Sequence, residues 1–353
     1  MGNNEDERTD HVGDDGGAAL EAAWRALEAG DVAGARRRAE RIGVDSPEGL
    51  FLLAGCAQEE GDYPQAMALL QRASEADPDW AMPELWMAEL LADDDSSPDA
   101  IEQALAHAER ALDLADEEPE FLSALALKAG LEIEGGDPEE ARRTLEDLPP
   151  PEVALGDTDA ALEIAELHLA LGDAQIAQAR LRTLTATVPD SADAWYALGS
   201  AAAELDDEEA MREAWKRAWQ LDSVPGADSQ LGRRLTDTEV AAVAERALEE
   251  LPARARELLK DVPIVVADMP AEADVDDGFD PRALGLFSGT AYSEGSTMGG
   301  QPGLTQIVIF RRNLERLADS DDELREQIRT TLLHETGHFF GMGDAELEDA
   351  GLG

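Results

Sequence analysis

A short polar turn recurs along the first two thirds of the chain, between stretches whose apolar residues follow helical spacing. The turn reads G-D-x-x-x-A: the glycine can end one helix, the aspartate can cap the next, and the small alanine lets the two helices pack closely. Successive copies begin 31, 34, 41, 36 and 33 residues apart, close to the roughly 34-residue period of helix–turn–helix repeats. Four copies are complete, a fifth lacks the glycine and a sixth is degenerate: they start at Gly30, Gly61, Gly136 and Gly172, at Leu205 with Asp206 and Ala210, and near Asp95 with Ala100.

This pattern resembles the tetratricopeptide repeat family. The turn at Gly61 continues through Ala66 and Ala73 to Asp77 and Pro78, as the second helix and terminating proline of that family do. Its first helix is matched by Trp195, Leu198 and Gly199. The resemblance covers residues 17–222 and implies an all-α solenoid of about six helix pairs, whose concave surface binds a protein or peptide partner.

Two stretches depart from the repeat pattern, an insertion at residues 93–97 and the proline-rich segment 148–151. Both affect the register of the neighbouring repeats and leave the architecture unchanged. Tryptophans at helical spacing are predicted to pack in the core rather than to contact a ligand, because periodic apolar positions usually face inward. These are Trp80, Trp86, Trp195, Trp215 and Trp219.

The pattern changes after residues 223–235, which contain Pro225, Gly226 and Gly232 and are predicted to be a linker. Helical and strand-like segments then alternate over a short length, which is typical of a small α+β domain. The predicted elements are a helix over 238–260 interrupted near Pro252, a buried strand at 263–267, a weaker strand at 283–287, the clearest strand at 305–310, and a short helix at 314–318. Ser320 and Glu323 form a capping box for a final long helix, whose buried side carries Leu324, Ile328, Leu332 and Phe339.

This last helix carries the sequence His334-Glu335-Thr336-Gly337-His338. Histidines four residues apart lie on one helix face, so both imidazoles can bind one zinc ion. Glu335 then points at the remaining coordination position, where it can take a proton from the attacking water. Gly341 allows the helix to end, and Asp344 can supply a third ligand once the chain turns back. The whole string, H-E-x-x-H-x-x-G-x-x-D, is the metzincin-like motif with aspartate in place of the third histidine.

From about Thr236 onward, the chain resembles a bacterial family of minimal metallopeptidases that end in H-E-x-x-H-x-F-G-x-x-D and a short acidic tail. Further matching stretches lie at 249–252, 262–267, 284–287 and 307–316. The resemblance implies a small α+β zincin-like domain, zinc ligand roles for His334, His338 and Asp344, and a catalytic role for Glu335. The predicted organisation is a disordered acidic tail (1–16), tetratricopeptide-like repeats (17–222), a linker (223–235) and a zincin-like metallopeptidase domain (236–353).

Acidic residues dominate the composition. Asp and Glu total 79 against 28 Lys and Arg, which gives a net charge of −51. Such a surface repels nucleic acid and anionic membranes, so neither is an expected partner. Two explanations stay open: adaptation to a salt-rich cytoplasm, since near 1 M salt the screening length falls to roughly 3 Å, or an acidic protein of an ordinary cytoplasm.

The single cysteine, Cys56, excludes an internal disulfide framework and suits a reducing cytoplasm. Its small neighbours predict a thiol packed in the core. No apolar run approaches the length of a membrane span, and the acidic start of the chain lacks the basic and apolar segments of a secretory signal. We therefore expect a cytoplasmic protein.

Two functions follow from the sequence. The first is a zinc-dependent peptidase whose repeats recruit a protein or peptide, with acidity that favours basic segments. The alternative is a non-catalytic interaction scaffold with a structural or idle zinc site. The intact Glu335 favours the enzyme, because a purely structural zinc site would not need it.

Further residues are assigned roles with less support from the motif. The strand at 305–310, or the region of Leu286, is the candidate partner for an extended substrate backbone. Tyr292 and Arg311 are the candidate oxyanion donors. His107 and His168 fall within repeat helices and are expected to have structural roles, while His11 lies in the tail.

Overall fold

The computed structural model describes residues 14–94, 97–224, 235–251, 253–289, 306–318 and 320–343. The chain forms two compact units, Met1–Thr187 (unit 1) and Val188–Gly353 (unit 2), which we describe separately. Among the described residues, no helix combines the length and the apolar character that crossing a membrane requires.

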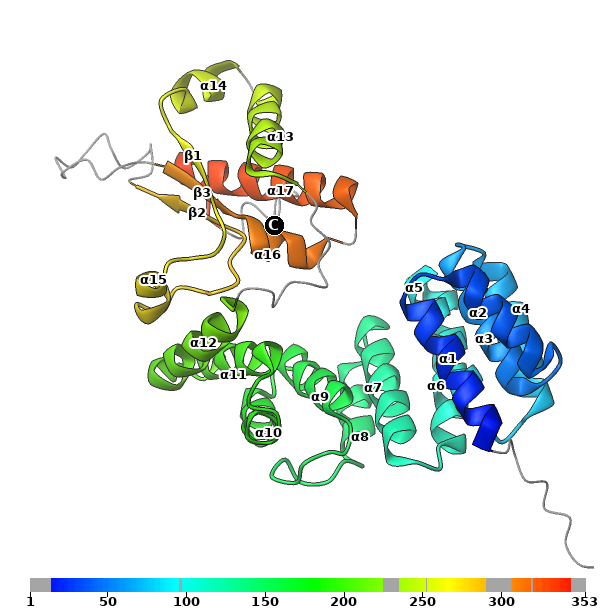
Figure 1. Cartoon of the computed structure of the whole chain (residues 1–353). Coiled ribbons are helices and arrows are strands. Elements are labelled where there is room, and N and C mark those ends of the chain that lie inside the picture. The colour runs from blue at the N-terminus through cyan, green and yellow to red at the C-terminus, as the bar shows by residue number, and fades with distance from the viewer. Residues whose placement is uncertain are drawn as a thin grey trace, which may run out of the picture. The chain divides into compact units, whose positions relative to one another are not determined.

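The described part of unit 1 is all helical, and successive helices pack side by side (Figure 1). This is the tetratricopeptide-like solenoid that the repeat spacing predicts. Its helices are α1 (Asp14–Glu28), α2 (Val32–Gly43), α3 (Pro47–Glu59), α4 (Tyr63–Ala76), α5 (Met82–Asp94), α6 (Pro98–Leu114), α7 (Glu118–Glu134), α8 (Pro138–Leu145), α9 (Thr158–Ala170) and α10 (Ala174–Thr187).

The glycine-aspartate turns act as predicted. Gly30, Gly61, Gly136 and Gly172 all have left-handed φ values, between 74° and 83°. This conformation is easy only for glycine, and it reverses the chain between the helices of a pair. Asp31, Asp62 and Asp137 each cap the next helix, as Asp31 does by accepting a hydrogen bond from the Gly34 amide at 2.9 Å. The motif alanines Ala35, Ala66, Ala141 and Ala177 are all 0% exposed.

The fifth copy of the turn has a different register from the one predicted. The predicted alignment puts Leu205 in the place of the glycine and Asp206 in the place of the capping aspartate. In the structure, Asp206 itself takes the left-handed conformation, with φ of 56°. Asp207 then caps the next helix by accepting from the Ala210 amide at 3.2 Å. Aspartate tolerates this conformation better than most residues, because its short polar side chain can bond locally.

Trp80 and Trp86 pack against the core of unit 1, as predicted. The Phe51 ring lies 4.7 Å from that of Trp80 and 4.8 Å from that of Trp86, between ring centroids. Trp24 closes the same cluster at 5.6 Å from Phe51. Cys56 is fully buried and unpaired, and burial raises the pKa of its thiol, which fits the expected core thiol.

Unit 2 begins with one more helix pair and continues into a small sheet with helices. The pair is α11 (Ala192–Glu204) and α12 (Glu208–Asp222). The elements that follow are α13 (Asp237–Glu250), α14 (Ala253–Leu259), β1 (Ile264–Ala267), α15 (Glu272–Asp276), β2 (Gly285–Ser288), β3 (Gln306–Phe310), α16 (Arg311–Leu317) and α17 (Asp321–Phe340). Every helix and strand predicted for this region is present, with ends shifted by a few residues, and the chain is confirmed as a helical solenoid followed by a small α+β domain.

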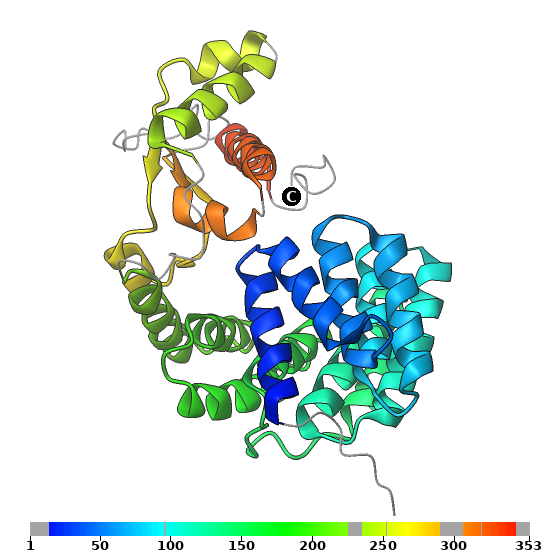
Figure 2. The same cartoon turned by 45° about the vertical axis from the view of Figure 1, so that its right-hand side comes forward.

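The sheet has the strand order β1-β3-β2, with β3 parallel to β1 and antiparallel to β2. Helices α13 and α17 contact each other and the sheet, so they cover the same face; Figure 2 shows α17 nearly end-on beside the strands. The core between them contains Ile307 and Ile309 of β3 with Leu324, Ile328 and Leu332 of α17. The prediction of a buried β1 was wrong: among the described strands β1 lies at the edge of the sheet, and Val265 on it is 38% exposed.

Hydrogen bonds and an ion pair connect the helix pair α11–α12 to the rest of unit 2. The Trp219 indole donates to the carbonyl oxygen of Pro270 at 3.0 Å. Lys216 pairs with Asp276 of α15 at 2.6 Å, and the Tyr196 hydroxyl donates to Asp280 at 3.0 Å. A helix pair with repeat-like sequence therefore shares a compact unit with the sheet.

Candidate metal centre and active site

Helix α17 is anchored at both ends, and it carries the residues of the predicted metal site. Ser320 caps it by accepting from the Glu323 amide at 3.1 Å, which is one half of the predicted capping box. Leu324, Ile328 and Leu332 are 0% exposed, as expected for the buried side. The helix ends at Gly341, whose φ of 84° is the left-handed C-cap that the motif predicts.

The two motif histidines face each other. The Nε2 atoms of His334 and His338 lie 3.0 Å apart. The Nδ1 atom of His338 lies 3.1 Å from the carbonyl oxygen of Met342, so a proton on Nδ1 would donate to it and leave Nε2 with its lone pair. Two nitrogens bound at about 2.0–2.1 Å to one tetrahedral zinc are roughly 3.4 Å apart, which a small ring movement would reach. The donor set and spacing therefore fit zinc.

Glu335 lies beside this pair and lines the same cavity as His334. The residue is only 8% exposed. It packs against β2 at Gly285, where an added Cβ would lie 2.9 Å from Glu335 Cγ and 2.9 Å from Thr331 Cγ2. A cavity of about 290 Å³ lies between this part of β2 and α17. It is lined by Ala283, Leu284, Gly285, Gln327, Thr330, Thr331, His334 and Glu335. A carboxylate therefore stands in a cavity next to an imidazole of the predicted metal site.

Two of the predicted site residues, Asp344 and Tyr292, lie outside the described residues. Within the described ranges, no group of three or more His, Cys, Asp or Glu residues is arranged to hold a metal. The other candidate oxyanion donor, Arg311, is in an ion pair with Asp268 at 2.5 Å and is not among the residues lining the 290 Å³ cavity.

The two strands considered for substrate pairing differ in how they are bonded within the sheet. Strand β3 is hydrogen-bonded on both sides, by β1 and β2, so residues 306–310 have no unpaired backbone edge to which a peptide could add. Strand β2 is paired on one side only among the described residues, and its neighbour is β3. Its Gly285 and Phe287 face α17, where Phe287 contacts Phe339 at 5.7 Å between ring centroids. The free edge next to Glu335 therefore belongs to β2.

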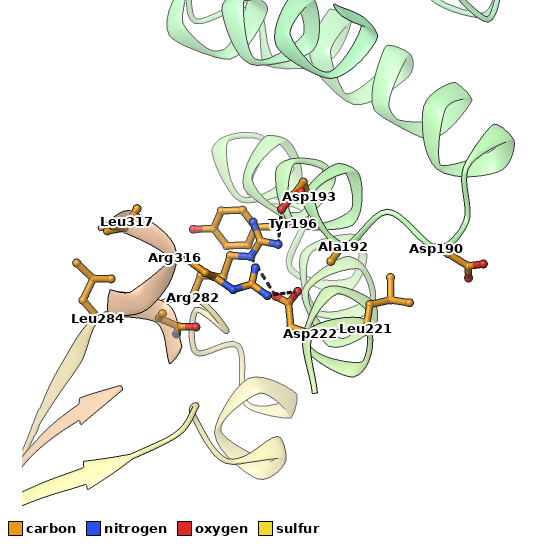
Figure 3. Close-up of a pocket in the computed structure, with 11 residues that line it drawn as sticks. Asp190, Ala192, Asp193, Tyr196, Leu221, Asp222, Arg282, Leu284, Arg316 and Leu317 are labelled. Carbon is orange, nitrogen blue, oxygen red and sulfur yellow. Dashed lines mark hydrogen bonds and ion pairs between the residues drawn. The ribbon is translucent and has the colours of Figure 1, made fainter. Parts of the chain in front are cut away.

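A second cavity of unit 2, of about 760 Å³, shares Leu284 with the first (Figure 3). Its wall contains Asp222 from the end of α12, which is 2% exposed and is paired with Arg282 and Arg316. None of these three is a predicted site residue, and Arg316 belongs only to the matching stretch 307–316. Asp222 ends a helix, and its partners are 60 and 94 residues away in the chain, so no local signal marks the cluster.

The described histidines outside the motif, His107 and His168, lie within the helices α6 and α9. His107 Nδ1 lies 2.8 Å from the carboxylate of Glu84, which is itself 2% exposed. His168 is 5% exposed within α9. Burial, together with the charge of Arg180, lowers the pKa of His168 to about 4. His11 lies outside the described residues.

Comparison with protein families gives three matches. Residues 259–352 match the family described as zincin-like metallopeptidase. Residues 26–90 and 162–228 match two families described as tetratricopeptide repeat. A comparison with curated proteins gives no match. The metallopeptidase match includes the whole H-E-x-x-H-x-x-G-x-x-D string.

Solved structures similar to the chain contain helical repeats. PilW, a type IV pilus biogenesis factor, is 16% identical with a TM-score of 0.45, and the match covers 62% of this chain and 100% of PilW. PilF of Pseudomonas aeruginosa is 17% identical with a TM-score of 0.43, over 60% of this chain and 92% of PilF. YrrB, a tetratricopeptide repeat protein, is 17% identical with a TM-score of 0.36, over 55% of this chain and 96% of YrrB.

Proposed function

We propose that this chain, which joins tetratricopeptide repeats to a zincin-like metallopeptidase domain, is a zinc-dependent peptidase. In this proposal His334, His338 and Asp344 hold the metal, and Glu335 is the catalytic base. The observation that carries it is the 3.0 Å approach of the two histidine Nε2 atoms, next to a carboxylate that lines the same cavity. The proposed boundaries are residues 17–222 for the repeats, 223–235 for the linker and 236–353 for the peptidase domain.

The proposed chemistry is hydrolysis of a peptide bond by water. Bound zinc would supply a Lewis acid that polarises the scissile carbonyl and lowers the pKa of water toward about 7. Glu335 accepts the proton of the attacking water and passes it to the leaving amine. Its position suits this role, because Gly285 and Thr331 enclose the side chain and leave the carboxylate next to His334. The carbonyl oxygen of Met342 holds His338 in the tautomer that can bind a metal.

We assign substrate binding to the edge of β2. An extended peptide could add to this edge as a further strand and bring its backbone past the cavity that Glu335 lines. The support is the strand order, in which β2 rather than β3 has an unbonded edge among the described residues. The cavity of about 760 Å³ begins at Leu284, directly before β2, and offers room for substrate residues beyond the cleaved bond.

The repeats are proposed to recruit a protein or peptide with basic segments. Tetratricopeptide helix pairs present extended surfaces for such partners. Carboxylates lie close together in unit 1: desolvation by the surrounding protein, with the charges of Asp93 and Glu163, raises the pKa of Glu89 to about 7. A lysine or arginine of a partner would relieve this repulsion. We also propose a reducing cytoplasm as the location, on the basis of the buried free thiol of Cys56.

The experiment that tests the function combines metal analysis with peptide-library cleavage. Wild-type protein is expected to bind about one zinc per chain and to cleave peptides, with activity lost to a chelator and restored by zinc. Glu335→Gln should retain the zinc and lose at least roughly 100-fold in kcat, within the usual contribution of a general base. The matched control is Glu326→Gln, which changes an exposed glutamate of the same helix.

Two results would count against the enzyme. Cleavage by Glu335→Gln at the wild-type rate would remove Glu335 from the mechanism. Zinc binding without cleavage of any library peptide would favour the alternative, an interaction scaffold with a structural or idle zinc site.

A further inference from the structure

Arg282 links the catalytic domain to the helix pair α11–α12. Its Nε donates to Asp222 at 3.1 Å, and its Nη2 pairs with Asp193 at 2.6 Å. The guanidinium also lies over the Tyr196 ring, 4.7 Å from the centroid. Figure 3 shows the side chain among these residues of the helix pair. Only 17% of the Arg282 side chain and 2% of the Asp222 side chain are exposed, so this ion pair is shielded from solvent and depends on its geometry, whereas Asp193 is 63% exposed.

The main chain around Arg282 is fixed from a second side by α16. Asn313 is 2% exposed, and its Nδ2 donates to the carbonyl oxygens of Pro281 at 3.0 Å and Ala283 at 2.8 Å. Arg316, one turn further along α16, donates to Asp222 at 2.6 Å. Asp222 therefore accepts hydrogen bonds from both arginines. Segment 281–283 is held on one side by the Arg282 side chain and on the other by the carbonyl oxygens of Pro281 and Ala283.

This segment runs directly into the wall of the catalytic cavity. Ala283, Leu284 and Gly285 all line the cavity that also contains His334 and Glu335. The hydrogen bond from the Phe310 amide to the Leu284 carbonyl, at 2.9 Å, starts the pairing of β2 with β3. Gly285 then sets how closely β2 approaches Glu335, since an added Cβ would lie 2.9 Å from its Cγ. A shift of the segment would move the surface against which Glu335 rests.

We propose that Arg282 is a positioning residue for the reaction, acting through segment 283–285 on Glu335. In this role Asp222 of α12 is its anchor, and the pair α11–α12, although built from a repeat-like sequence, is part of the catalytic unit. The inference rests on the proposed peptidase function. A purely structural role would change stability alone, whereas a positioning role changes kcat in protein that is folded and loaded with zinc.

The test uses the full-length chain with Arg282→Gln, Arg282→Lys and Asp222→Asn, and measures kcat, KM, zinc per chain and thermal unfolding. A misplacement of about 1 Å can lower a rate by roughly 100-fold. We expect Arg282→Gln to keep its zinc and lose about 10- to 100-fold in kcat, with KM changed less than about threefold. Arg282→Lys should recover part of the loss because it keeps the charge. Arg325→Gln is the control, since Arg325 pairs with the exposed Asp322 one turn earlier on α17.

Amide hydrogen exchange of residues 284–288 gives a second readout that does not depend on activity. It should speed up in Arg282→Gln and Asp222→Asn and stay unchanged in Arg325→Gln. Wild-type kcat and wild-type exchange in folded Arg282→Gln would overturn the inference. If Arg282→Gln does not fold, Arg282→Lys decides, because unchanged kcat and exchange there also contradict it. A wild-type protein that cleaves nothing would contradict the peptidase proposal instead, and the exchange measurement would still test the positioning of β2.

Discussion

Gly285 of β2 and Glu335 of α17 are in such close contact that a methyl group at position 285 would lie 2.9 Å from Glu335 Cγ. Real Cβ contacts are essentially never this short, so one of the two elements would have to move. The glycine therefore sets the distance between β2 and the helix that carries the H-E-x-x-H motif.

Gly285→Ala is expected to lower both activity and stability. Overpacking of this kind costs about 1–3 kcal/mol of unfolding free energy, and displacement of Glu335 should lower kcat by roughly 10-fold or more. Denaturant unfolding and steady-state kinetics measure the two effects. The control is Gly130→Ala in α7, where an added Cβ would meet only Leu167 Cδ2 at 3.7 Å and should stabilise the helix by about 0.5–1 kcal/mol. Full activity of Gly285→Ala would show that Glu335 tolerates the shift.

Asp344→Ala is expected to weaken zinc binding. Loss of a direct ligand should cost at least the 10- to 100-fold that is typical for partners of metal ligands. Competition with a chromophoric chelator measures the affinity. Asp349→Ala, which changes another acidic residue of the same tail, should leave it unchanged. Equal affinities for wild type and Asp344→Ala would assign the third ligand to another residue.

His168→Leu should reduce the sensitivity of unit 1 to acid. In the unfolded chain a histidine has a pKa near 6.5, whereas burial lowers that of His168 to about 4 in the folded protein. Because the unfolded state then binds the proton first, stability is present above about pH 6.5 and is lost as the pH falls toward 4, by on the order of 3 kcal/mol at most. Unfolding at pH 7 and pH 5 should differ less in the variant than in wild type, and equal pH dependence would contradict this account.

Asp206→Gly is expected to stabilise the turn between α11 and α12. Asp206 has a φ of 56°, a conformation that is strained for residues with a Cβ, and glycine should relieve it by about 0.5–1 kcal/mol. Asp207→Ala should have the opposite effect, of about 1 kcal/mol, because it removes the helix cap. Denaturant midpoints of the two variants should move in opposite directions, and a destabilised Asp206→Gly would show that the aspartate side chain bonds locally.

Added salt should stabilise the protein if its charge reflects a salt-rich cytoplasm. The net charge of −51 repels itself across the surface, and screening at about 1 M salt shortens the range of that repulsion to roughly 3 Å. Thermal melts from about 0.1 to 3 M KCl should show a rising midpoint. A midpoint that is constant or falls with KCl would favour an ordinary cytoplasm.

Local features of the fold were predictable because their causes are local. The left-handed glycines at Gly30 and Gly341 follow from the need to reverse the chain after a helix. The facing imidazoles of His334 and His338 follow from a spacing of four residues on one helix. The register error at Asp206 arose because aspartate can replace glycine at such a turn and also cap a helix, so the sequence alone leaves two alignments.

Features set by distant parts of the chain were not predictable. The apolar run from Ile264 to Ala267 would suit either a central or an edge strand. Its place at the edge of the described sheet follows only from the strand order, in which β3 pairs with both β1 and β2. The same pairing places β2, rather than residues 306–310, at an edge of the sheet among the described residues, which is why β2 is the proposed substrate edge. Asp222 and Arg282 are 60 residues apart, and no local sequence pattern at either residue predicts their contact.

The ion pair between Asp222 and Arg282 bears on how this protein could be re-engineered. A chimera that exchanges the recruiting module for another one would conventionally be joined after the last repeat, at residue 222, and would thereby discard the carboxylate that Arg282 requires. A junction at Thr187 and Val188 keeps α11 and α12 in one compact unit with the zincin-like domain. Swapped modules should therefore be joined upstream of that helix pair.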